Sequence, residues 1–180
     1  MIRIKRSVCL LTVLLFINFS LSANGGNVPE KLKFKADKTF RIAQFTDIHW
    51  DSNIPEVCDR TIELLQNVLA AEKPDFVVLT GDIVTVSPAR DGWLRIAGVF
   101  EQEGLPWAAV LGNHDDETDL SRSQIFELLE GLPGFMGEKG PVSGAGNYVL
   151  QVKGHQNERT SALLYFIDSH AYTQIPGAGT

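Results

Sequence analysis

The sequence predicts an α/β fold in which parallel strands alternate with helices. Three short apolar runs are each followed by a segment whose apolar residues recur at helical spacing. This alternation builds parallel sheets through right-handed crossovers. Two later apolar runs separated by a polar turn predict an antiparallel hairpin. With 180 residues, 44% of them hydrophobic and 21% charged, the chain is long enough for one domain with a substantial core.

Residues 1–23 have the pattern of a secretory signal peptide. Three basic residues within the first six positions precede an apolar run over 8–19, and small residues follow it. The run is shorter than the roughly 20 apolar residues that a membrane-spanning helix needs. We therefore predict cleavage near Ser22 or Ala23 and an exported protein, periplasmic or secreted, with no stable membrane insertion after cleavage. The alternative is a retained membrane anchor.

The charge and the cysteine content of the chain indicate which partners and which sources of stability it can have. Without its signal peptide the chain carries 13 basic against 22 acidic side chains. Because phosphate backbones are held by Lys and Arg, this balance argues against a nucleic-acid partner. Only Cys58 remains after cleavage, so no disulfide can form within the chain, and it is expected to pack in a helix. Stability must then come from the core or from bound metal.

Residues 24–38 are predicted to form a mobile leader to the first strand, over 40–45. A helix begins at Pro55, a favourable first position, and ends at Lys73-Pro74. Its apolar face is expected to consist of Val57, Thr61, Leu64, Leu65, Val68 and Leu69.

The second strand, over 76–79, leads to a second helix. Ser87-Pro88 is expected to supply its cap and first turn, and Gly104 its end. Its buried stripe is predicted to consist of Trp93, Ile96, Ala97 and Phe100.

The third strand, over 107–111, precedes a third helix that is predicted to begin near Ser121. Ser121 and Gln124 have capping-box spacing. Its core-facing residues are predicted to be Ile125, Leu128 and Leu129.

Residues 133–146 contain five glycines. A phosphate-binding loop would need them between a strand and a helix and ending in Gly-Lys-Ser/Thr, so a flexible surface loop is the simpler interpretation. Strands are then predicted over 148–152 and 161–167, joined by the polar turn 153–160.

Polar side chains follow each of the three predicted parallel strands. Asp47 and His49 come after the first strand, Asp82 after the second, and Asn113 and His114 after the third. The carboxyl ends of strands in an open α/β sheet gather at one edge, where ligands bind. We therefore expect these side chains to converge. The alternative is that they are ordinary polar turns that close the strands.

The residue types favour metal-assisted chemistry. Carboxylate, imidazole and amide side chains together suit Zn, Mn or Fe. Asp82 has two oxygens with which to bridge two metals, and Asn113 can add a neutral oxygen. Two such metals lower the pKa of a bridging water and hold both ends of an in-line displacement at phosphorus, which is phosphoester hydrolysis. His114 then remains to protonate the leaving oxygen as general acid.

These residues resemble the motifs of the calcineurin-like metallophosphoesterases. The first three blocks of that family are Asp-x-His, Gly-Asp and Gly-Asn-His-Asp/Glu. Here they stand as Asp47-Ile48-His49, Gly81-Asp82 and Gly112-Asn113-His114-Asp115, in the same order and strand context. The stretch from Gly112 to Glu117 also resembles the branch of small phosphatases related to purple acid phosphatases. The resemblance covers roughly residues 38–170.

The resemblance implies a role for each matched residue. Asp47 and His49 bind the first metal, Asp82 bridges, Asn113 binds the second metal, His114 is the general acid and Asp115 orients it. It also implies two divalent transition metals (Mn, Fe or Zn) and a small-molecule or protein phosphoester substrate. The second block is followed by Ile83-Val84-Thr85, without a tyrosine, so a purple iron–tyrosinate site is not expected.

The family completes its site with a further His and a Gly-His-x-His block. Gly154-His155-Gln156-Asn157 begins like that block but has Asn157 where the second His belongs, and it lies in the predicted hairpin turn. His155 is therefore not expected to bind metal. His170 follows a strand and is better placed, but it is interpreted as a surface residue.

By this resemblance, residues 39–180 are a metallophosphoesterase domain truncated at its C-terminal end. They correspond to the parallel-sheet half of an αββα sandwich, followed by the hairpin. The predicted function is an exported metal-dependent phosphoesterase. The alternative is an inactive or partly folded fragment with at most weak metal binding. A serine hydrolase is set aside because no Gly-x-Ser-x-Gly motif occurs.

Overall fold

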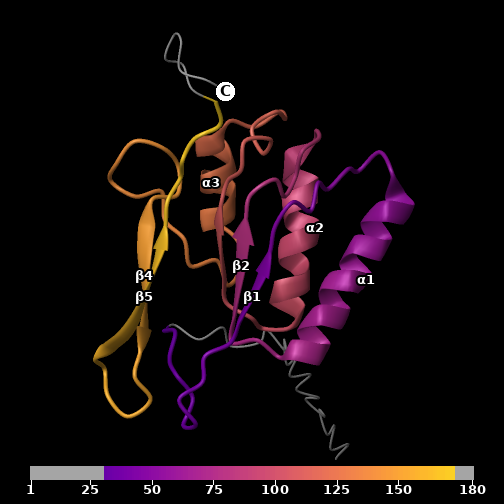
Figure 1. Ribbon diagram of the computed structural model, residues 1–180. Coiled ribbons are helices and arrows are strands. Elements are labelled where there is room, and N and C mark those ends of the chain that lie inside the picture. The colour runs from indigo at the N-terminus through magenta and orange to yellow at the C-terminus, as the bar shows by residue number, and fades with distance from the viewer. Residues whose placement is uncertain (1–30, 173–180) are drawn as a thin grey trace, which may run out of the picture.

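The computed structural model describes residues 31–172 (Figure 1). The predicted signal peptide, residues 1–23, and the first part of the leader lie outside this range. In the described part of the chain, no helix has a stretch long and apolar enough to cross a membrane.

Strands and helices alternate as predicted. The elements are β1 (Ile42–Phe45), α1 (Pro55–Glu72), β2 (Phe76–Thr80), α2 (Ala89–Gln102), β3 (Trp107–Val110) and α3 (Arg122–Glu130). The strands form a parallel sheet in the order β1-β2-β3, with Phe45 opposite Leu79 and Leu79 opposite Ala109. Helices α1 and α2 lie side by side on one side of β1 and β2 (Figure 1). The α/β fold class is therefore confirmed.

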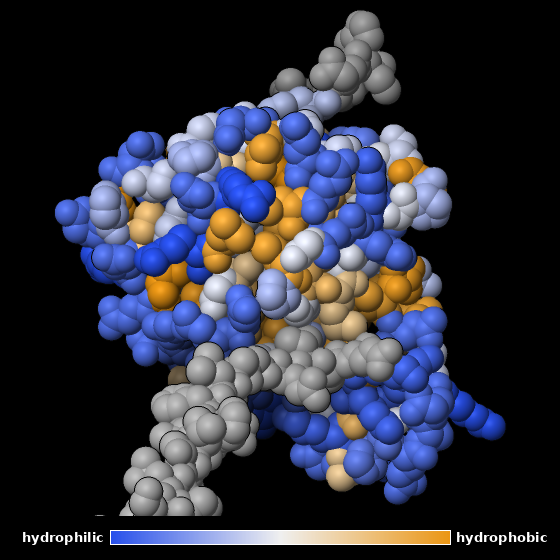
Figure 2. Space-filling model, turned by 180° about the vertical axis from the view of Figure 1, so that it is seen from behind, coloured by the Kyte–Doolittle hydropathy of each residue, from blue (hydrophilic) through white to orange (hydrophobic). Residues whose placement is uncertain are grey.

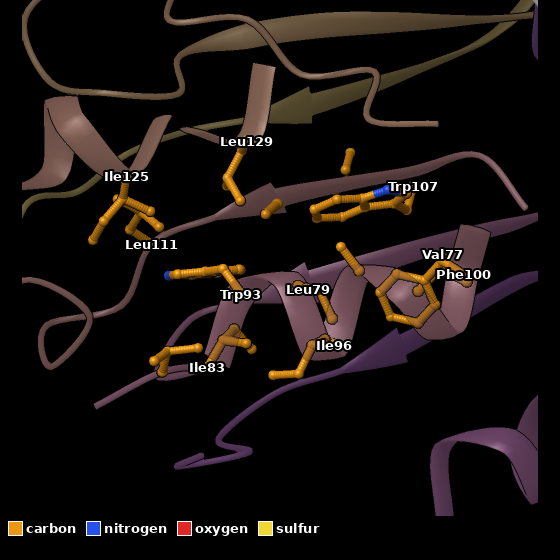
Figure 3. Packing of buried hydrophobic residues seen from close by; sticks show 14 of the residues in the cluster. Val77, Leu79, Ile83, Trp93, Ile96, Phe100, Trp107, Leu111, Ile125 and Leu129 are labelled. Atoms are coloured by element: carbon orange, nitrogen blue, oxygen red, sulfur yellow. The ribbon is translucent and has the colours of Figure 1, made fainter. Parts of the chain in front are cut away.

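The main core lies between α2 and the sheet. Trp93, Ile96 and Phe100 of α2 are fully buried, and the close-up in Figure 3 shows them among residues of β2 and β3. The rings of Phe100 and Trp107 are 5.6 Å apart. Burying each such side chain contributes roughly 1.5–3 kcal/mol. The predicted stripe of α2 is confirmed, and this core supports the sheet edge at which β2 and β3 end.

Helix α1 packs with part of the predicted face: Leu65 and Leu69 are buried as expected, but Val57 and Leu64 are not. Its buried residues are Cys58, Leu65 and Leu69, whereas Val57 is 47% and Leu64 62% exposed. Positions 58, 65 and 69 are separated by seven and four residues and lie along one stripe of a helix. Val57 and Leu64 each precede a member of that stripe by one position, which turns them about 100° away from it.

The start of α2 also differs from the prediction. The helix begins at Ala89, and neither Ser87 nor Pro88 provides a side-chain cap. Instead, the backbone N–H of Ala89 donates to Asp119 Oδ1 over 2.8 Å. By contrast, the capping box predicted at the start of α3 is present.

A hairpin of β4 (Tyr148–Lys153) and β5 (Thr160–Phe166) follows, and it is antiparallel as predicted. Tyr148 attaches it to the sheet, because its hydroxyl donates to the Ala109 carbonyl over 2.7 Å and accepts from the Ala109 N–H over 3.1 Å. Burial raises the pKa of Tyr148, so this hydroxyl keeps its proton. The hairpin lies on the other side of the sheet from α1 and α2 (Figure 1).

The described end of the leader is attached to the hairpin. Leu32 is buried, its carbonyl accepts from the Lys153 N–H, and the Phe34 N–H donates to the Lys153 carbonyl, each over 2.9 Å. Within the predicted leader, residues 24–38, the described residues Leu32 and Phe34 are thus paired with β4. Lysines alternate with Leu32 and Phe34 over residues 31–35, which is a strand-like pattern, but it does not show which distant strand the segment joins.

Part of the glycine-rich loop is packed rather than exposed. Ala145 is 1% exposed, and a Cβ at Gly146 would lie 2.3 Å from the Phe126 ring. The loop does not open a helix, in agreement with the rejection of a phosphate-binding loop.

Apolar side chains also reach the surface on the strands. Ile42 of β1, Tyr165 of β5 and Ile167 are 42%, 67% and 69% exposed. The space-filling view from behind likewise shows apolar residues at the surface among polar ones (Figure 2).

Candidate metal centre

The ends of β1 and β2 place three predicted ligands side by side. The Asp47 N–H donates to the Gly81 carbonyl over 3.0 Å and the His49 N–H to the Asp82 carbonyl over 2.9 Å, so the two segments stay paired beyond the strands. Asp47, His49 and Asp82 all have left-handed φ angles, of 52°, 47° and 54°. Such a conformation costs a non-glycine residue about 1–3 kcal/mol and is concentrated at functional sites.

The side chains of these residues form a cluster. Asp47, His49 and Asp82 each offer a ligand atom, and these atoms lie within 4.8 Å of one another. Two donors at roughly 2.0–2.2 Å from one cation lie at most about 4.4 Å apart, so a small shift of the side chains would let one cation bind all three. Two carboxylates and an imidazole are a donor set that fits Mn, Fe or Zn. The residues present thus fit a divalent transition metal.

The loop after β3 reaches the same edge. The His114 N–H donates to Asp82 Oδ1 over 2.9 Å, and the rings of His114 and His49 are 5.8 Å apart. The side-chain amide of Asn113 donates to the Tyr172 hydroxyl over 2.9 Å. The residues predicted at the three strand ends therefore lie at one edge of the sheet. Sequence reasoning missed Tyr172.

Two glycines allow the loops after β2 and β3 to touch. Gly81 has a φ of 97°, and a Cβ there would lie 2.7 Å from the Gly112 Cα. A Cβ on Gly112 would lie 2.2 Å from Asp82 Oδ1. Side chains at these positions would separate the loops and displace the Asp82 carboxylate, which explains the glycines in both motifs.

Asp115 has contacts that differ from the predicted ones. Its carboxylate is fully buried and accepts four backbone N–H groups at 2.7–3.1 Å, from Asp82, Ile83, Val84 and Gly112. Burial raises the pKa of Asp115, although these N–H groups act in the opposite direction. The carboxylate thus holds the loop after β2 against the loop after β3. The sequence analysis had expected this carboxylate to orient His114, but its hydrogen bonds all go to backbone N–H groups.

Glu117 takes the place expected for Asp115. Its Oε2 lies 2.7 Å from His114 Nδ1, and this hydrogen bond raises the pKa of His114. With Nδ1 donating to Glu117, Nε2 is the ring nitrogen left for other chemistry. The spacing of three residues between His114 and Glu117 was a usable sequence signal, but Asp115 lay closer in the motif.

Comparison with models of known protein families assigns the chain to one of them. A model of the calcineurin-like phosphoesterases matches residues 40–173. The chain belongs to this family. The resemblance seen in the sequence is confirmed, and the parallel sheet with its separate hairpin is consistent with one half of a metallophosphoesterase domain.

Several proteins are similar in sequence to this chain over most of its length. It is 31% identical over 172 residues to a protein of Arabidopsis thaliana named probable inactive purple acid phosphatase 29, which covers 81% of this chain and 44% of the relative. It is 30% identical over 169 residues to phosphatase DCR2 of Saccharomyces cerevisiae, covering 81% of this chain and 29% of the relative. The chain spans less than half the length of these relatives.

Gly112→Ala is expected to weaken Mn²⁺ binding to the candidate metal centre at least about tenfold, because the new Cβ displaces the Asp82 carboxylate. The overpacking should also lower the free energy of unfolding by about 1–3 kcal/mol. Electron paramagnetic resonance of free Mn²⁺ and urea unfolding measure the two effects. The control is Gly98→Ala in α2, where a Cβ meets nothing within 4 Å and should stabilise the helix by about 0.5–1 kcal/mol. Unchanged Mn²⁺ affinity in Gly112→Ala would contradict this assignment.

An Arg–Asp pair next to the loop after β3 was not predicted. Arg122, the first residue of α3, donates to both carboxylate oxygens of Asp168, which follows β5. Burial acts to raise the pKa of Asp168, but the hydrogen bonds from Arg122 and the Ala145 N–H outweigh it and hold that pKa below its usual value. Asp168 follows a strand, as the predicted ligands do, but nothing local in the sequence indicates its partner 46 residues away.

The lowered pKa of Asp168 predicts a pH dependence of stability. Because the pKa is lower in the folded than in the unfolded state, the ionised group stabilises the fold above its unfolded value of about 4. That contribution is lost as the pH falls through the folded pKa. The difference in free energy of unfolding between wild type and Asp168→Asn should therefore be larger at pH 7 than at pH 3 in urea titrations. A difference that grows on acidification would contradict this. The control is Glu63→Gln, at an exposed position inside α1, which should change stability little at either pH.

The two remaining histidines lie outside the cluster. His155 is exposed in the turn between β4 and β5. His170 is exposed, and its backbone N–H donates to Asp168 Oδ1 over 2.9 Å. Neither belongs to the close group of metal-ligating side chains that the described residues form.

Proposed function

We propose that this protein is a metal-dependent phosphoesterase that hydrolyses small-molecule or protein phosphate esters. The observation that carries the proposal is the convergence of Asp47, His49 and Asp82 within 4.8 Å, beside His114, in a calcineurin-like phosphoesterase. The signal-like residues 1–23 support export, and the acidic balance supports a partner other than nucleic acid.

The proposed roles divide between metal binding and proton transfer. Asp47, His49 and Asp82 would hold one divalent cation, and Asp82 with Asn113 would hold a second. Bound there, such cations supply positive charge that draws the phosphoryl oxygens and lowers the pKa of water. The metal is proposed to be Mn, Fe or Zn.

His114 is proposed as the general acid. Glu117 accepts from Nδ1 over 2.7 Å, which fixes the ring and favours its protonated form. Nε2 then carries the proton that passes to the leaving oxygen of the ester. Asp115 is proposed to act only by holding the two loops together, because its carboxylate is occupied by backbone N–H groups.

A second candidate is an inactive metal-binding protein. Two observations favour it: relatives carry the name probable inactive purple acid phosphatase, and neither His155 nor His170 joins the cluster. This candidate predicts Mn²⁺ binding without turnover.

The purified protein, loaded with Mn²⁺ or Zn²⁺, distinguishes the candidates by hydrolysis of bis-p-nitrophenyl phosphate and p-nitrophenyl phosphate. Metal-dependent turnover that Asp82→Ala lowers at least about 10³-fold supports the phosphoesterase, since that residue touches both proposed metal positions. Mn²⁺ binding that Asp82→Ala abolishes, without turnover, supports the inactive candidate. Absence of both binding and turnover contradicts both. The exposed Asp91→Asn serves as the control.

A further inference from the structure

Arg122 uses every N–H of its guanidinium within the site region. Nη1 donates to the Gly112 carbonyl over 2.7 Å and to Asp116 Oδ1 over 3.3 Å. Nη2 donates to the Leu111 carbonyl over 3.1 Å and to Asp168 Oδ1. Nε donates to Asp168 Oδ2 over 3.4 Å. An arginine has five donors, and each of them has an acceptor here.

Two of these acceptors lie directly before the site residues. β3 ends at Val110, and the pairing of β3 with β2 ends at that residue. The carbonyls of Leu111 and Gly112 therefore lie beyond the sheet ladder and take their donors from Arg122. Asn113 and His114 follow at once, so the guanidinium sets the direction in which the chain enters the site.

The guanidinium of Arg122 also contacts Asp168, which follows the hairpin strand β5. The Asp168 side chain is fully buried and also accepts from the Ala145 and His170 N–H groups, over 2.7 and 2.9 Å. The segment after Asp168 carries Tyr172, whose hydroxyl accepts from the Asn113 amide. The residues after β5 are thus connected to the loop after β3 twice: Asp168 through Arg122, and Tyr172 directly to Asn113.

We propose that Arg122 is a positioning residue, which holds Asn113 and His114 at the metal centre by joining the end of β3 to Asp168. The inference rests on the proposed function of that site. Lysine cannot replace the arginine, because one ammonium group cannot span two carbonyls and both oxygens of a carboxylate. What distinguishes Arg122 from an ion pair with Asp168 alone is that its two carbonyl partners, Leu111 and Gly112, directly precede Asn113 and His114.

The test compares Arg122→Lys and Arg122→Met with the surface control Arg95→Lys. Arg95 pairs with Asp59 at 3.5 Å, and its side chain is 60% exposed. Three quantities are measured in each variant: kcat and KM, Mn²⁺ affinity by electron paramagnetic resonance, and hydrogen–deuterium exchange of peptides covering residues 111–116 and 55–72. The last peptide covers α1 and reports general loss of stability.

Both Arg122 variants should lower kcat about 10–100-fold with little change in KM, as expected for misplaced catalytic groups. They should also exchange faster at residues 111–116 but not in α1, and bind Mn²⁺ more weakly. Arg95→Lys should match wild type in all three measurements.

Wild-type exchange at residues 111–116, or faster exchange there with wild-type kcat and Mn²⁺ affinity, would overturn the proposal. Faster exchange throughout the chain would also overturn it, in favour of a purely stabilising role. If wild type itself does not hydrolyse esters, the proposed function fails separately. Local exchange at residues 111–116 together with weakened Mn²⁺ binding then still supports the positioning role.

Discussion

His114→Ala is expected to lower kcat/KM for an alkyl phosphate ester by about 10²–10⁴-fold, the usual contribution of a general acid. An alkoxide is a poor leaving group and needs the proton that His114 Nε2 would supply. p-Nitrophenolate leaves without much protonation, so p-nitrophenyl phosphate should lose far less. Steady-state kinetics on glycerol 2-phosphate and p-nitrophenyl phosphate measure the two losses.

The control for this prediction is His155→Ala, which removes an exposed histidine from the turn between β4 and β5. It should leave both substrates unaffected. Glu117→Gln should reproduce part of the selective loss, because the amide keeps a hydrogen bond to Nδ1 but no longer favours the charged ring. Equal losses on both substrates in His114→Ala would show that His114 is structural or binds metal.

Asp115→Ala is expected to lower the free energy of unfolding by about 3–5 kcal/mol. The change leaves four backbone N–H groups of the two site loops without their acceptor, in a position that is 0% exposed. Buried donors without acceptors carry the full cost of desolvation. Urea unfolding followed by circular dichroism measures the loss.

Asp115→Asn is the second variant, because its amide keeps the size of the side chain but turns one acceptor into a donor that faces N–H groups. It should lose less stability than Asp115→Ala. The control is Asp59→Ala: its side chain is 77% exposed with one contact to Arg95 at 3.5 Å, so a loss of under about 1 kcal/mol is expected. A loss of similar size in Asp115→Ala would show that water replaces the carboxylate.

Local pattern determined the order of elements and the polar residues at the strand ends. Helix starts and ends such as Pro55, Lys73 and Ser121 depend on neighbours a few residues away, and so could be predicted. The convergence of Asp47, His49 and Asp82 could also be predicted, because parallel strands joined by helices bring their carboxyl ends to one edge.

Side-chain partnerships were decided only by the tertiary structure. Glu117 rather than Asp115 contacts His114, because Asp115 turns inward to four N–H groups. Asp119 caps α2 from 30 residues away, and Arg122 meets Asp168 across 46 residues. Such contacts depend on which way each side chain points once the sheet and hairpin have packed. Sequence spacing carries the periods of helix and strand, but in the loops it does not decide between nearby candidates such as Asp115 and Glu117.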